Sequence, residues 1–431
     1  MFSYSITPYI TLFWTILVSS FYCLGQIEVP PSIFEPLEET AVRQSTDTAH
    51  ATISSVGDIM VHQTQLNAQL SSENTYDFNN NFDAMRPLLQ TPAISIANLE
   101  TVFGGSSLGF KAYPRFNTPD VLANAIDSAG INLVTTTNNH CYDQGTPALL
   151  RTLDVLNERG LESVGTQKKS TDKNYVIREA KGIRIGITAY TYESGKKDSL
   201  KTINGLVVPK DYAHCINSFD PYSPKNDLPR IKRTIHSMRA DSADVIVFIM
   251  HWGKEYEPLP NEVQVFMANQ LNAYGVDVIF GSHPHVVQPF DLMRNDSTGN
   301  ETFVAYSMGN FISNQRYETM QNYATEDGLL VGVEFIKPPH AEVQLKSVFY
   351  EPTWVNRVKS GDRYQYEILP VNEYLKRRDT ITLSPQQWER IEQSKKRTNT
   401  AIQKLNVQKK LQNASIQFYE YGDLLNKHRQ R

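Results

Sequence analysis

The chain has 431 residues, of which 42 are Lys or Arg and 46 are Asp or Glu, so its formal net charge is −4. Hydrophobic residues at 40% and charged residues at 20% are ordinary globular usage, which excludes disordered, collagen-like and polytopic membrane proteins. The length exceeds one typical domain but also fits one large α/β unit with appendages. The charge balance offers no basic surface for a phosphate backbone, so no nucleic-acid partner is expected.

The N-terminal segment predicts export. Residues 9–24 form a nearly uncharged apolar run that ends in the small-x-small pattern Cys23-Leu24-Gly25. The run is short for a spanning helix, which needs roughly 20 residues, so residues 1–25 are interpreted as a cleaved signal peptide, with a retained membrane anchor as the alternative. The first basic residue is Arg43, so only the amino terminus sets the orientation. Either interpretation places the protein in the cell envelope, as a periplasmic, surface or membrane-anchored protein.

The folded part is expected to start near residue 51. Residues 26–50 are rich in Pro, Glu, Ser and Thr without apolar periodicity, which is typical of a flexible tether. Strand-like runs then alternate with amphipathic helices that end before Gly130 and Gly160. This βαβ alternation predicts an α/β fold with a largely parallel sheet. The expected strands are residues 51–56, 93–97, 133–136, 183–189, 245–250 and 276–280.

After residue 306 the pattern changes to strands with little helix between them. Residues 329–336 and 343–350 predict antiparallel strands that complete a second sheet. Beyond residue 384 the sequence is polar and helix-prone, which predicts a solvated helical appendage. We therefore expect one domain over residues 51–350 and a C-terminal extension over residues 351–431 that is largely helical after residue 384.

Two cysteines stay in the mature chain if the signal peptide is removed. Cys141 and Cys215 lack C-x-x-C spacing, so they form neither a zinc clip nor a disulfide framework. Two buried thiols are the expectation, and a bridge between them is the alternative.

Polar residues gather where the predicted strands end. Ligands in open α/β sheets bind beyond the carboxyl ends of the strands. Taken singly, Asp58 could cap a helix, Glu100 could lie on the surface, and His251 could be a core histidine. Five strand ends that all carry Asp, Glu, Asn or His favour one shared site. Its candidate residues are Asp58, Glu100, Asn139, His140, His251, His283 and His285.

Mixed carboxylate, amide and imidazole ligands suit divalent metals such as Mn, Fe or Zn. The number of candidate ligands is enough for two ions. Two such ions roughly 3.5 to 4 Å apart activate water and clamp the oxygens of a phosphoryl group. The sequence therefore predicts two divalent metal ions as cofactors, without identifying the metal.

Six motifs in chain order, within about residues 52–315, resemble those of the CapA family of poly-γ-glutamate capsule biosynthesis proteins. The motifs are Gly57-Asp58-Ile59-Met60, Asn98-Leu99-Glu100, Thr137-Asn138-Asn139-His140, His251-Trp252-Gly253, Gly281-Ser282-His283-Pro284-His285 and Tyr306-Ser307-Met308-Gly309-Asn310-Phe311. That family is similar to the calcineurin-like metallophosphoesterases. The resemblance implies a layered α/β/β/α sandwich with a dimetal centre.

The resemblance also implies a role for each candidate residue. Asp58 would bind one metal and Glu100 would bridge the two, while Asn139 and His251 would bind the second metal. The set would be completed by His283 and His285 as further ligands, by His140 as a catalytic group beside the metals, and by Asp143 and Glu255 as residues that orient histidines from outside.

The sequence departs from the phosphoesterase pattern at two positions. Phosphoesterases present Asp-x-His in the first motif, whereas here the nearest histidine, His62, stands four residues after Asp58. His62 is either a ligand or a residue in the first turn of a helix. Glu100 stands where phosphoesterases commonly use Asp. In the loop after Glu100, Lys111 and Arg115 are candidates for contact with an anionic substrate, or simply solvated.

Two functional hypotheses follow. The first is an extracytoplasmic dimetal hydrolase, or related enzyme, that acts on poly-γ-glutamate, another anionic envelope polymer or a phosphoester. The second is a non-catalytic accessory protein that binds such a polymer or aids its export, together with membrane proteins of capsule assembly. His140 beside a ligand set favours the enzyme, and the family's association with capsule assembly favours the accessory. A cytoplasmic phosphodiesterase is a weaker third interpretation, because it requires residues 9–24 to be buried.

Overall fold

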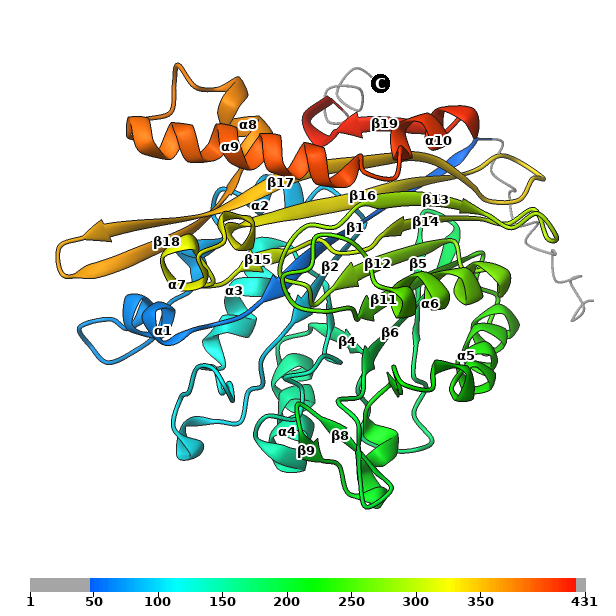
Figure 1. Ribbon diagram of the computed structural model, residues 1–431, viewed down its shortest axis with the longest axis horizontal. Helices are drawn as coiled ribbons and strands as arrows, with labels where there is room; N and C mark the ends of the chain where they lie inside the picture. The colour runs from blue at the N-terminus through cyan, green and yellow to red at the C-terminus, as the bar shows by residue number, and fades with distance from the viewer. Residues whose placement is uncertain (1–46, 424–431) are drawn as a thin grey trace, which may run out of the picture. The chain divides into compact units, whose positions relative to one another are not determined.

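The computed structural model describes residues 47–423 (Figure 1). The predicted signal peptide and nearly all of the predicted tether lie outside this range. Strand β1 (Ala49–Ile59) begins slightly before the expected start of the folded part. Within residues 47–423, no helix is long and apolar enough to cross a membrane.

The first sheet has nine strands, with β18-β17-β16-β1-β2-β3-β4 in order, β15 paired with β1, and β19 paired with β17. Strands β1 to β4 run parallel, whereas β16, β17 and β18 are antiparallel to their neighbours on this path. Besides β1, its strands are β2 (Ile94–Leu99), β3 (Leu133–Thr135), β4 (Glu162–Val164), β15 (Asn310–Ile312), β16 (Asp327–Lys337), β17 (Gln344–Ser360), β18 (Arg363–Pro370) and β19 (Gln417–Glu420).

The second sheet has seven strands, with β10-β6-β11-β12-β14-β13 in order and β5 paired with β6. Its central strands run parallel, and β5 and β13 are antiparallel to their partners. The strands are β5 (Val176–Ala180), β6 (Ile183–Tyr192), β10 (Ser218–Phe219), β11 (Val245–His251), β12 (Val278–Ser282), β13 (Phe290–Arg294) and β14 (Glu301–Ala305). A separate small sheet contains β7 (Lys196–Lys197), β8 (Leu200–Ile203) and β9 (Leu206–Val207).

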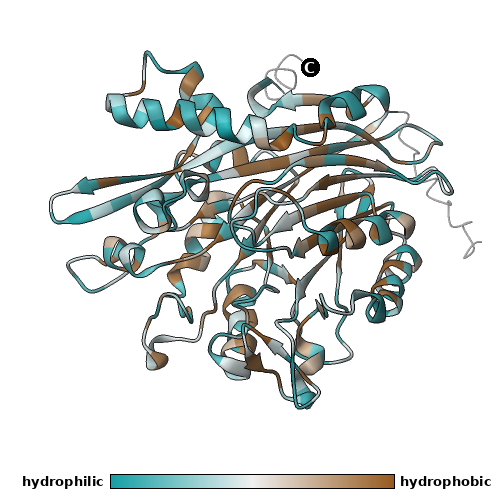
Figure 2. Cartoon of the chain, in the orientation of Figure 1, coloured by the Kyte–Doolittle hydropathy of each residue, from teal (hydrophilic) through white to brown (hydrophobic). Residues whose placement is uncertain are grey.

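The two sheets pack face to face, and helices cover their outer faces. The alternation of side chains along a strand produces these layers. In β11, Val245 and Val247 belong to the core between the sheets, whereas Ile246 and Phe248 belong to the core under the outer helices. The strands of both sheets are accordingly rich in apolar residues (Figure 2). The predicted α/β/β/α sandwich is therefore confirmed.

The outer helices divide between the two sheets. Helices α1 to α4 lie on the side of the first sheet, and α5 and α6 on the side of the second. Their bounds are α1 (Gln63–Gln69), α2 (Arg86–Leu89), α3 (Val121–Ala129), α4 (Gly145–Glu158), α5 (Leu228–Ala240) and α6 (Glu262–Ala273). Short 3-10 helices lie in the connections, at Asn79–Asn81, Ser106–Leu108, Lys210–Cys215, Pro224–Asn226 and Tyr323–Glu326.

One expectation about the sheets is wrong. The six strands predicted from βαβ alternation do not form one sheet, since β1, β2 and β3 lie in the first and β6, β11 and β12 in the second. The later strands β16 and β17 extend the first sheet, where β16 pairs antiparallel with β1, and do not complete the second. Strand periodicity reports which residues are extended and buried, but it does not report which strands pair.

The C-terminal part contains α7 (Tyr317–Met320), α8 (Val371–Lys376), α9 (Pro385–Ile402) and α10 (Val407–Asn413). Helix α9 begins at a capping box in which Ser384 accepts from the backbone N–H of Gln387, with Pro385 at the first helical position. The expected domain boundary at residue 350 lies inside β17, so the first sheet continues beyond it.

Both cysteines of the described chain are buried free thiols. Cys141 and Cys215 therefore form no bridge with each other.

Candidate metal centre

Residues from both sheets converge at the carboxyl ends of their strands. Asp58 lies near the end of β1 and Glu100 directly follows β2, while His251 ends β11. Asn139 and His140 follow β3 in the chain, and His283 and His285 follow β12. All seven predicted residues are buried, with exposures of 0 to 5%. The edges of two sheets, and not of one, supply the site.

Glu100 is a fully buried carboxylate. Neither of its oxygens has a partner in the part of the chain that the structure describes. Its Oε1 lies 3.5 Å from Nε2 of His251 and 3.9 Å from Nε2 of His285. Burial and then the nearby carboxylate of Asp58 raise the pKa of Glu100 well above its usual value. A buried carboxylate without a partner is costly, and a cation beside it would remove that cost.

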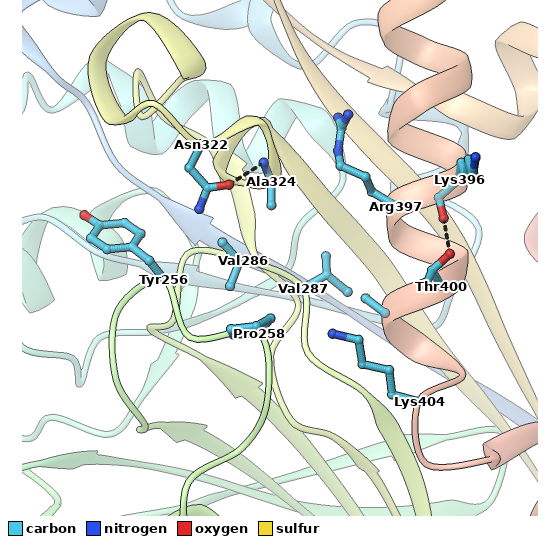
Figure 3. Close-up of a pocket in the computed structure, with 11 residues that line it drawn as sticks. Tyr256, Pro258, Val286, Val287, Asn322, Ala324, Lys396, Arg397, Thr400 and Lys404 are labelled. Carbon is cyan, nitrogen blue, oxygen red and sulfur yellow. Dashed lines mark hydrogen bonds between the residues drawn. The ribbon is translucent and has the colours of Figure 1, made fainter.

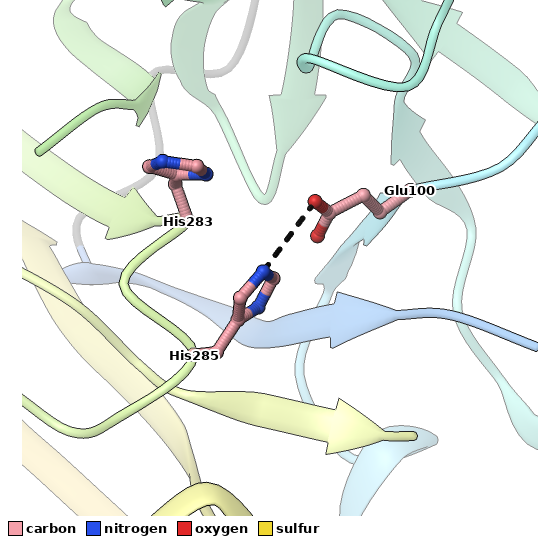
Figure 4. Close-up of side chains that lie close together, drawn as sticks. All are labelled: Glu100, His283 and His285. Atoms are coloured by element: carbon pink, nitrogen blue, oxygen red, sulfur yellow. Dashed lines mark ion pairs between the residues drawn. The ribbon is translucent and has the colours of Figure 1, made fainter. Parts of the chain in front are cut away.

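The potential ligand atoms form two groups. Asp58, Glu100 and His251 have ligand atoms within 4.8 Å of one another, and so do Glu100, His283 and His285. Figure 4 shows the second group, in which Glu100 faces the two histidines. Glu100 belongs to both groups, which is the position of a bridging carboxylate. One detail differs from the implied roles, because Asp58 and His251 fall in the same group.

The carboxylate of Asp58 is held from two sides. Oδ1 accepts from Nδ2 of Asn98 at 2.8 Å, and Oδ2 accepts from the backbone N–H of His283 at 3.3 Å. Nδ1 of His285 lies 3.2 Å from the same Oδ2. Asp58 therefore connects the end of β1 to the loop after β12.

The histidines are suited to bind a metal in their neutral form. Burial lowers the pKa of His251 and of His283 well below the usual value, so each keeps a free lone pair. Nε2 of His251 lies 2.8 Å from Oδ1 of Asn139, which places the predicted amide ligand beside the predicted imidazole ligand. Nδ1 of His283 is buried without a hydrogen bond within the described chain. These donors, together with Glu100, fit divalent first-row metals.

His140 forms a dyad with Asp143. Nδ1 of His140 donates to Oδ2 of Asp143 at 2.6 Å, which leaves Nε2 as the nitrogen able to exchange a proton. Asp143 also accepts from the backbone N–H of Phe116 at 2.7 Å and from Nδ2 of Asn204 at 3.1 Å. The ring of Phe116 packs edge-on against the His140 ring. These contacts fix the tautomer and orientation of His140.

Two other candidates, His62 and Glu255, belong to neither ligand group. His62 is the N-cap residue of α1, and its Nδ1 accepts from the backbone N–H of Asn314 at 3.2 Å. Burial lowers the pKa of His62 to about 4. The structure therefore favours the helix-start interpretation of His62. Glu255 is exposed, and within the described chain no site histidine hydrogen-bonds to it.

Sequence reasoning missed several residues that hold the ligands. Nδ1 of His251 lies 2.9 Å from Oγ of Ser282, and Nδ1 of His285 lies 3.1 Å from Oδ1 of Asn310. Asn98 bonds Asp58 and accepts from Oγ1 of Thr135 at 3.0 Å. Three of these residues, Asn98, Ser282 and Asn310, lie inside the six sequence motifs. Membership of those motifs is therefore the sequence feature that could have identified them.

The loop after β12 contains two residues in an unusual backbone conformation. His283 and His285 have φ angles of 98° and 56°, which side-chain-bearing residues seldom adopt. A Cβ on Gly281 would lie 2.0 Å from the carbonyl oxygen of Tyr306, so only glycine fits there. Such strain is typical of functional sites, where surrounding contacts hold it in place.

Comparison with known proteins gives one family match. Residues 52–315, more than half of the chain, match the model of the bacterial capsule synthesis protein PGA_cap. The PGA biosynthesis protein CapA of Bacillus subtilis (strain 168) is 30% identical over 189 residues, which cover 43% of this chain and 44% of that protein. The capsule biosynthesis protein CapA of Bacillus anthracis is 27% identical over 201 residues, 46% of this chain and 44% of that protein. The chain thus spans less than half the length of these relatives.

Similar solved structures are more distant. The NAD nucleotidase NadN of Haemophilus influenzae is 14% identical with a TM-score of 0.41, over 82% of this chain and 61% of that chain. The Thermus thermophilus sulfate thiohydrolase SoxB is 12% identical with a TM-score of 0.36, over 71% of this chain and 42% of that chain. Neither likeness is close enough to carry an argument about the site.

Proposed function

Because the chain belongs to the PGA_cap family of bacterial capsule synthesis proteins, we propose that it is a metal-dependent hydrolase, or a related transferase, of an anionic capsule polymer such as poly-γ-glutamate. We further propose that it acts outside the cytoplasm, since residues 9–24 have the composition of an export signal. The relatives' names describe biosynthesis of capsule or PGA, and they motivate the choice of polymer.

One observation carries the enzymatic proposal. The unpartnered carboxylate of Glu100 lies in both ligand groups, and the dyad of His140 and Asp143 follows directly after the candidate ligand Asn139. A protein that only bound a polymer would need no oriented proton carrier next to buried ligands. The arrangement is what metal-assisted hydrolysis requires.

The chain's own residues have separable tasks in this proposal. Asp58, Glu100 and the histidines would hold two divalent ions, and bound metals would activate water and neutralise charge on the substrate. The attacking water loses one proton to solvent as its oxygen bonds to the reacting centre, and the bond to the leaving atom breaks with its electron pair on that atom. Nε2 of protonated His140 supplies a proton to the leaving atom, and solvent then restores the proton of His140. Asp143 holds the ring in position and stabilises its charged form.

The alternative is an accessory protein that binds the polymer or aids its export. The relatives' names favour it, because they describe biosynthesis and not cleavage. On this alternative the ligand cluster would be structural, and His140 would have no role that depends on its proton.

Activity of a His140→Ala variant separates the two proposals. The purified chain is supplied with Mn, Fe or Zn and assayed on poly-γ-glutamate, by size-exclusion chromatography, and on a chromogenic phosphodiester. Loss of a general acid should reduce turnover by about 10² to 10⁴-fold while metal content stays unchanged. Turnover is compared well below the melting temperature of each variant, because the truncation also removes the buried contact with Asp143. His236→Ala, an exposed histidine on α5, is the matched control.

If wild-type protein shows no turnover with any of these metals, and His140→Ala supports normal capsule assembly in cells, the accessory proposal replaces the enzymatic one.

A further inference from the structure

Helix α9 borders two pockets in succession. One pocket, of about 350 Å³, lies along its N-terminal half, and the other, of about 410 Å³, lies along its C-terminal half. Residues three or four apart share a face of a helix. Six residues of α9 and its end that line the pockets follow this spacing, at Gln386, Arg390, Gln393, Arg397, Thr400 and Lys404, and four neighbours also line them, at Gln387, Glu389, Lys396 and Ala401. One face of α9 therefore borders both pockets, and we call their combined lining the α9 surface.

Three arginines meet around one carboxylate in the first pocket. The carboxylate of Glu318 lies 3.4 Å from Nε of Arg316 and 3.5 Å from Nη2 of both Arg357 and Arg390. These distances are long for charge-assisted hydrogen bonds. Nε of Arg316 makes no hydrogen bond within residues 47–423, although its side chain is only 4% exposed. The guanidinium groups of the three arginines thus retain N–H donors that Glu318 does not engage in short hydrogen bonds.

The arginines are fixed by other contacts. Buried Glu326 accepts from Nη2 of Arg390 at 2.6 and 2.8 Å and from Nη2 of Arg316 at 3.2 Å. Arg357 stacks over the ring of Tyr364 at 4.5 Å. Glu318 itself is 47% exposed, so it can leave without disturbing the arginines. The pocket is a preorganised carboxylate site that an exposed side chain of the same protein partly fills.

A second carboxylate borders this pocket but stands apart from the arginines. Glu389 is exposed and accepts from Nε2 of Gln393 at 3.0 Å. It forms no ion pair within the described chain, so Glu318 is the carboxylate that competes for the arginines.

The second pocket has apolar walls and free cations (Figure 3). Lys396 and Lys404 are exposed and form no ion pair with any described residue. Val286 and Val287, which line the pocket opposite α9, directly follow His285 of the metal centre. The pocket and the metal centre therefore share one chain segment.

We propose that the α9 surface binds an extended polymer that carries regularly spaced carboxylates, and holds it beside the metal centre. The choice of poly-γ-glutamate as that polymer rests on the proposed function. Arginines and lysines pair with the carboxylates, and the apolar walls contact the methylene groups between them. Helix α9 has 18 residues, so it is about 27 Å long at 1.5 Å per residue.

The repeat length of such a polymer matches this dimension. A γ-linked glutamyl unit contributes five backbone bonds, which corresponds to about 6 Å in an extended chain. Roughly four units would therefore lie along α9.

Binding is measured by fluorescence anisotropy of labelled poly-γ-glutamate with the full chain in EDTA, where no metal-dependent turnover contributes. Lys396→Gln with Lys404→Gln should weaken binding by about 5- to 20-fold and flatten its salt dependence, because two cations are lost. Glu318→Gln should tighten binding by about 3- to 10-fold, because the internal competitor loses its charge. Lys225→Gln with Lys232→Gln, exposed residues before and in α5, is the control with the same charge change.

The inference is overturned if the double lysine variant behaves like its control, or if Glu318→Gln fails to tighten binding while melting normally. Equal binding of polyphosphate or DNA also overturns it, because the surface would then be an unspecific cation patch. Since the assay excludes turnover, specific binding without any hydrolysis in the metal-loaded protein would refute the proposed function and leave this inference standing.

Discussion

At the scale of single residues, the metal assignment depends on one carboxylate, that of Glu100, which has no hydrogen-bond partner among the described residues. Asp58 is engaged by Asn98 and by the loop after β12, whereas both oxygens of Glu100 are unbonded within the described chain. Either protonation of the carboxylate or a cation bound beside it can offset the free-energy cost of burying it. The clustering of His251, His283 and His285 around Glu100 favours the cation, because neutral imidazoles offer lone pairs to it.

Glu100→Gln and Asp58→Asn should each lower the metal content of the purified protein from about two equivalents to less than one, because a ligand charge is lost from the cluster. Inductively coupled plasma mass spectrometry measures this after dialysis against trace metal. Glu262→Gln, which changes an exposed carboxylate at the start of α6, should keep the wild-type content. Unchanged metal content in both ligand variants would show that the cluster does not bind metal.

The ligand candidates could be found in the sequence because each follows a buried apolar run. Asp58, Glu100 and His251 stand where a strand ends. The common edge of parallel strands places Asp58 and Glu100 together, whereas His251 comes from the second sheet, whose packing against the first brings it to them. The supporting contacts could not be found in this way. Ser282 and Asn310 reach the histidines only through the folded path of their loops, which no local periodicity encodes.

At the scale of elements, β17 is joined to α8 through a buried carboxylate. Oε1 of Glu351 accepts from the backbone N–H groups of Asn372 and Glu373 at 2.6 and 3.3 Å, which satisfies the free donors at the start of α8. Burial raises the pKa of Glu351 from 4.5 to about 8. Between these two values the folded protein keeps a proton on Glu351 that the unfolded chain releases. The free energy of unfolding therefore falls as pH rises through this window.

Glu351→Gln should remove that dependence, because the amide keeps the accepting oxygen and has no charge to bury. The variant should exceed the wild type in free energy of unfolding by on the order of 2 kcal/mol near pH 9, with a much smaller difference near pH 5. Urea unfolding at both pH values measures it. Glu342→Gln, on an exposed residue, should follow the wild type. A wild-type slope retained in Glu351→Gln would contradict the buried-acid interpretation.

The positions of the strands along the chain could be predicted from the sequence better than the pairing between the strands. The run at residues 245–250 is strand β11, because a continuous apolar segment of that length fits a strand buried on both faces. The pairing of β16 with β1 joins residues far apart in sequence, such as Val333 and Ile53. That choice depends on the packing of two whole sheets, so strand patterns alone assigned β16 to the wrong sheet.

At the scale of the whole molecule, the C-terminal extension is part of the fold and not a solvated appendage. Helix α9 looks largely hydrophilic in Figure 2, which is what the sequence shows. Its few apolar side chains are nevertheless deeply placed, since Trp388 and Ile391 pack with Trp354 of β17. The central core includes Ile402, Val407, Leu411 and Ile416. The few apolar residues in the sequence of α9 are therefore those that form a narrow stripe along the helix and pack against the sheet.

A chain that ends at residue 350 should fail to fold, although this was the boundary expected from the sequence. The truncation cuts β17 in the middle, removes β18, and takes Ile402, Val407 and Leu411 out of the central core. Each fully buried aliphatic side chain contributes about 1.5 to 3 kcal/mol, so these three alone approach the roughly 5 to 15 kcal/mol by which domains are stable. A chain that ends at residue 423 keeps all of these contacts and should remain soluble with one cooperative melting transition. Circular dichroism and size-exclusion chromatography compare the two, and a monomeric, cooperatively melting protein that ends at residue 350 would show that the extension is dispensable after all.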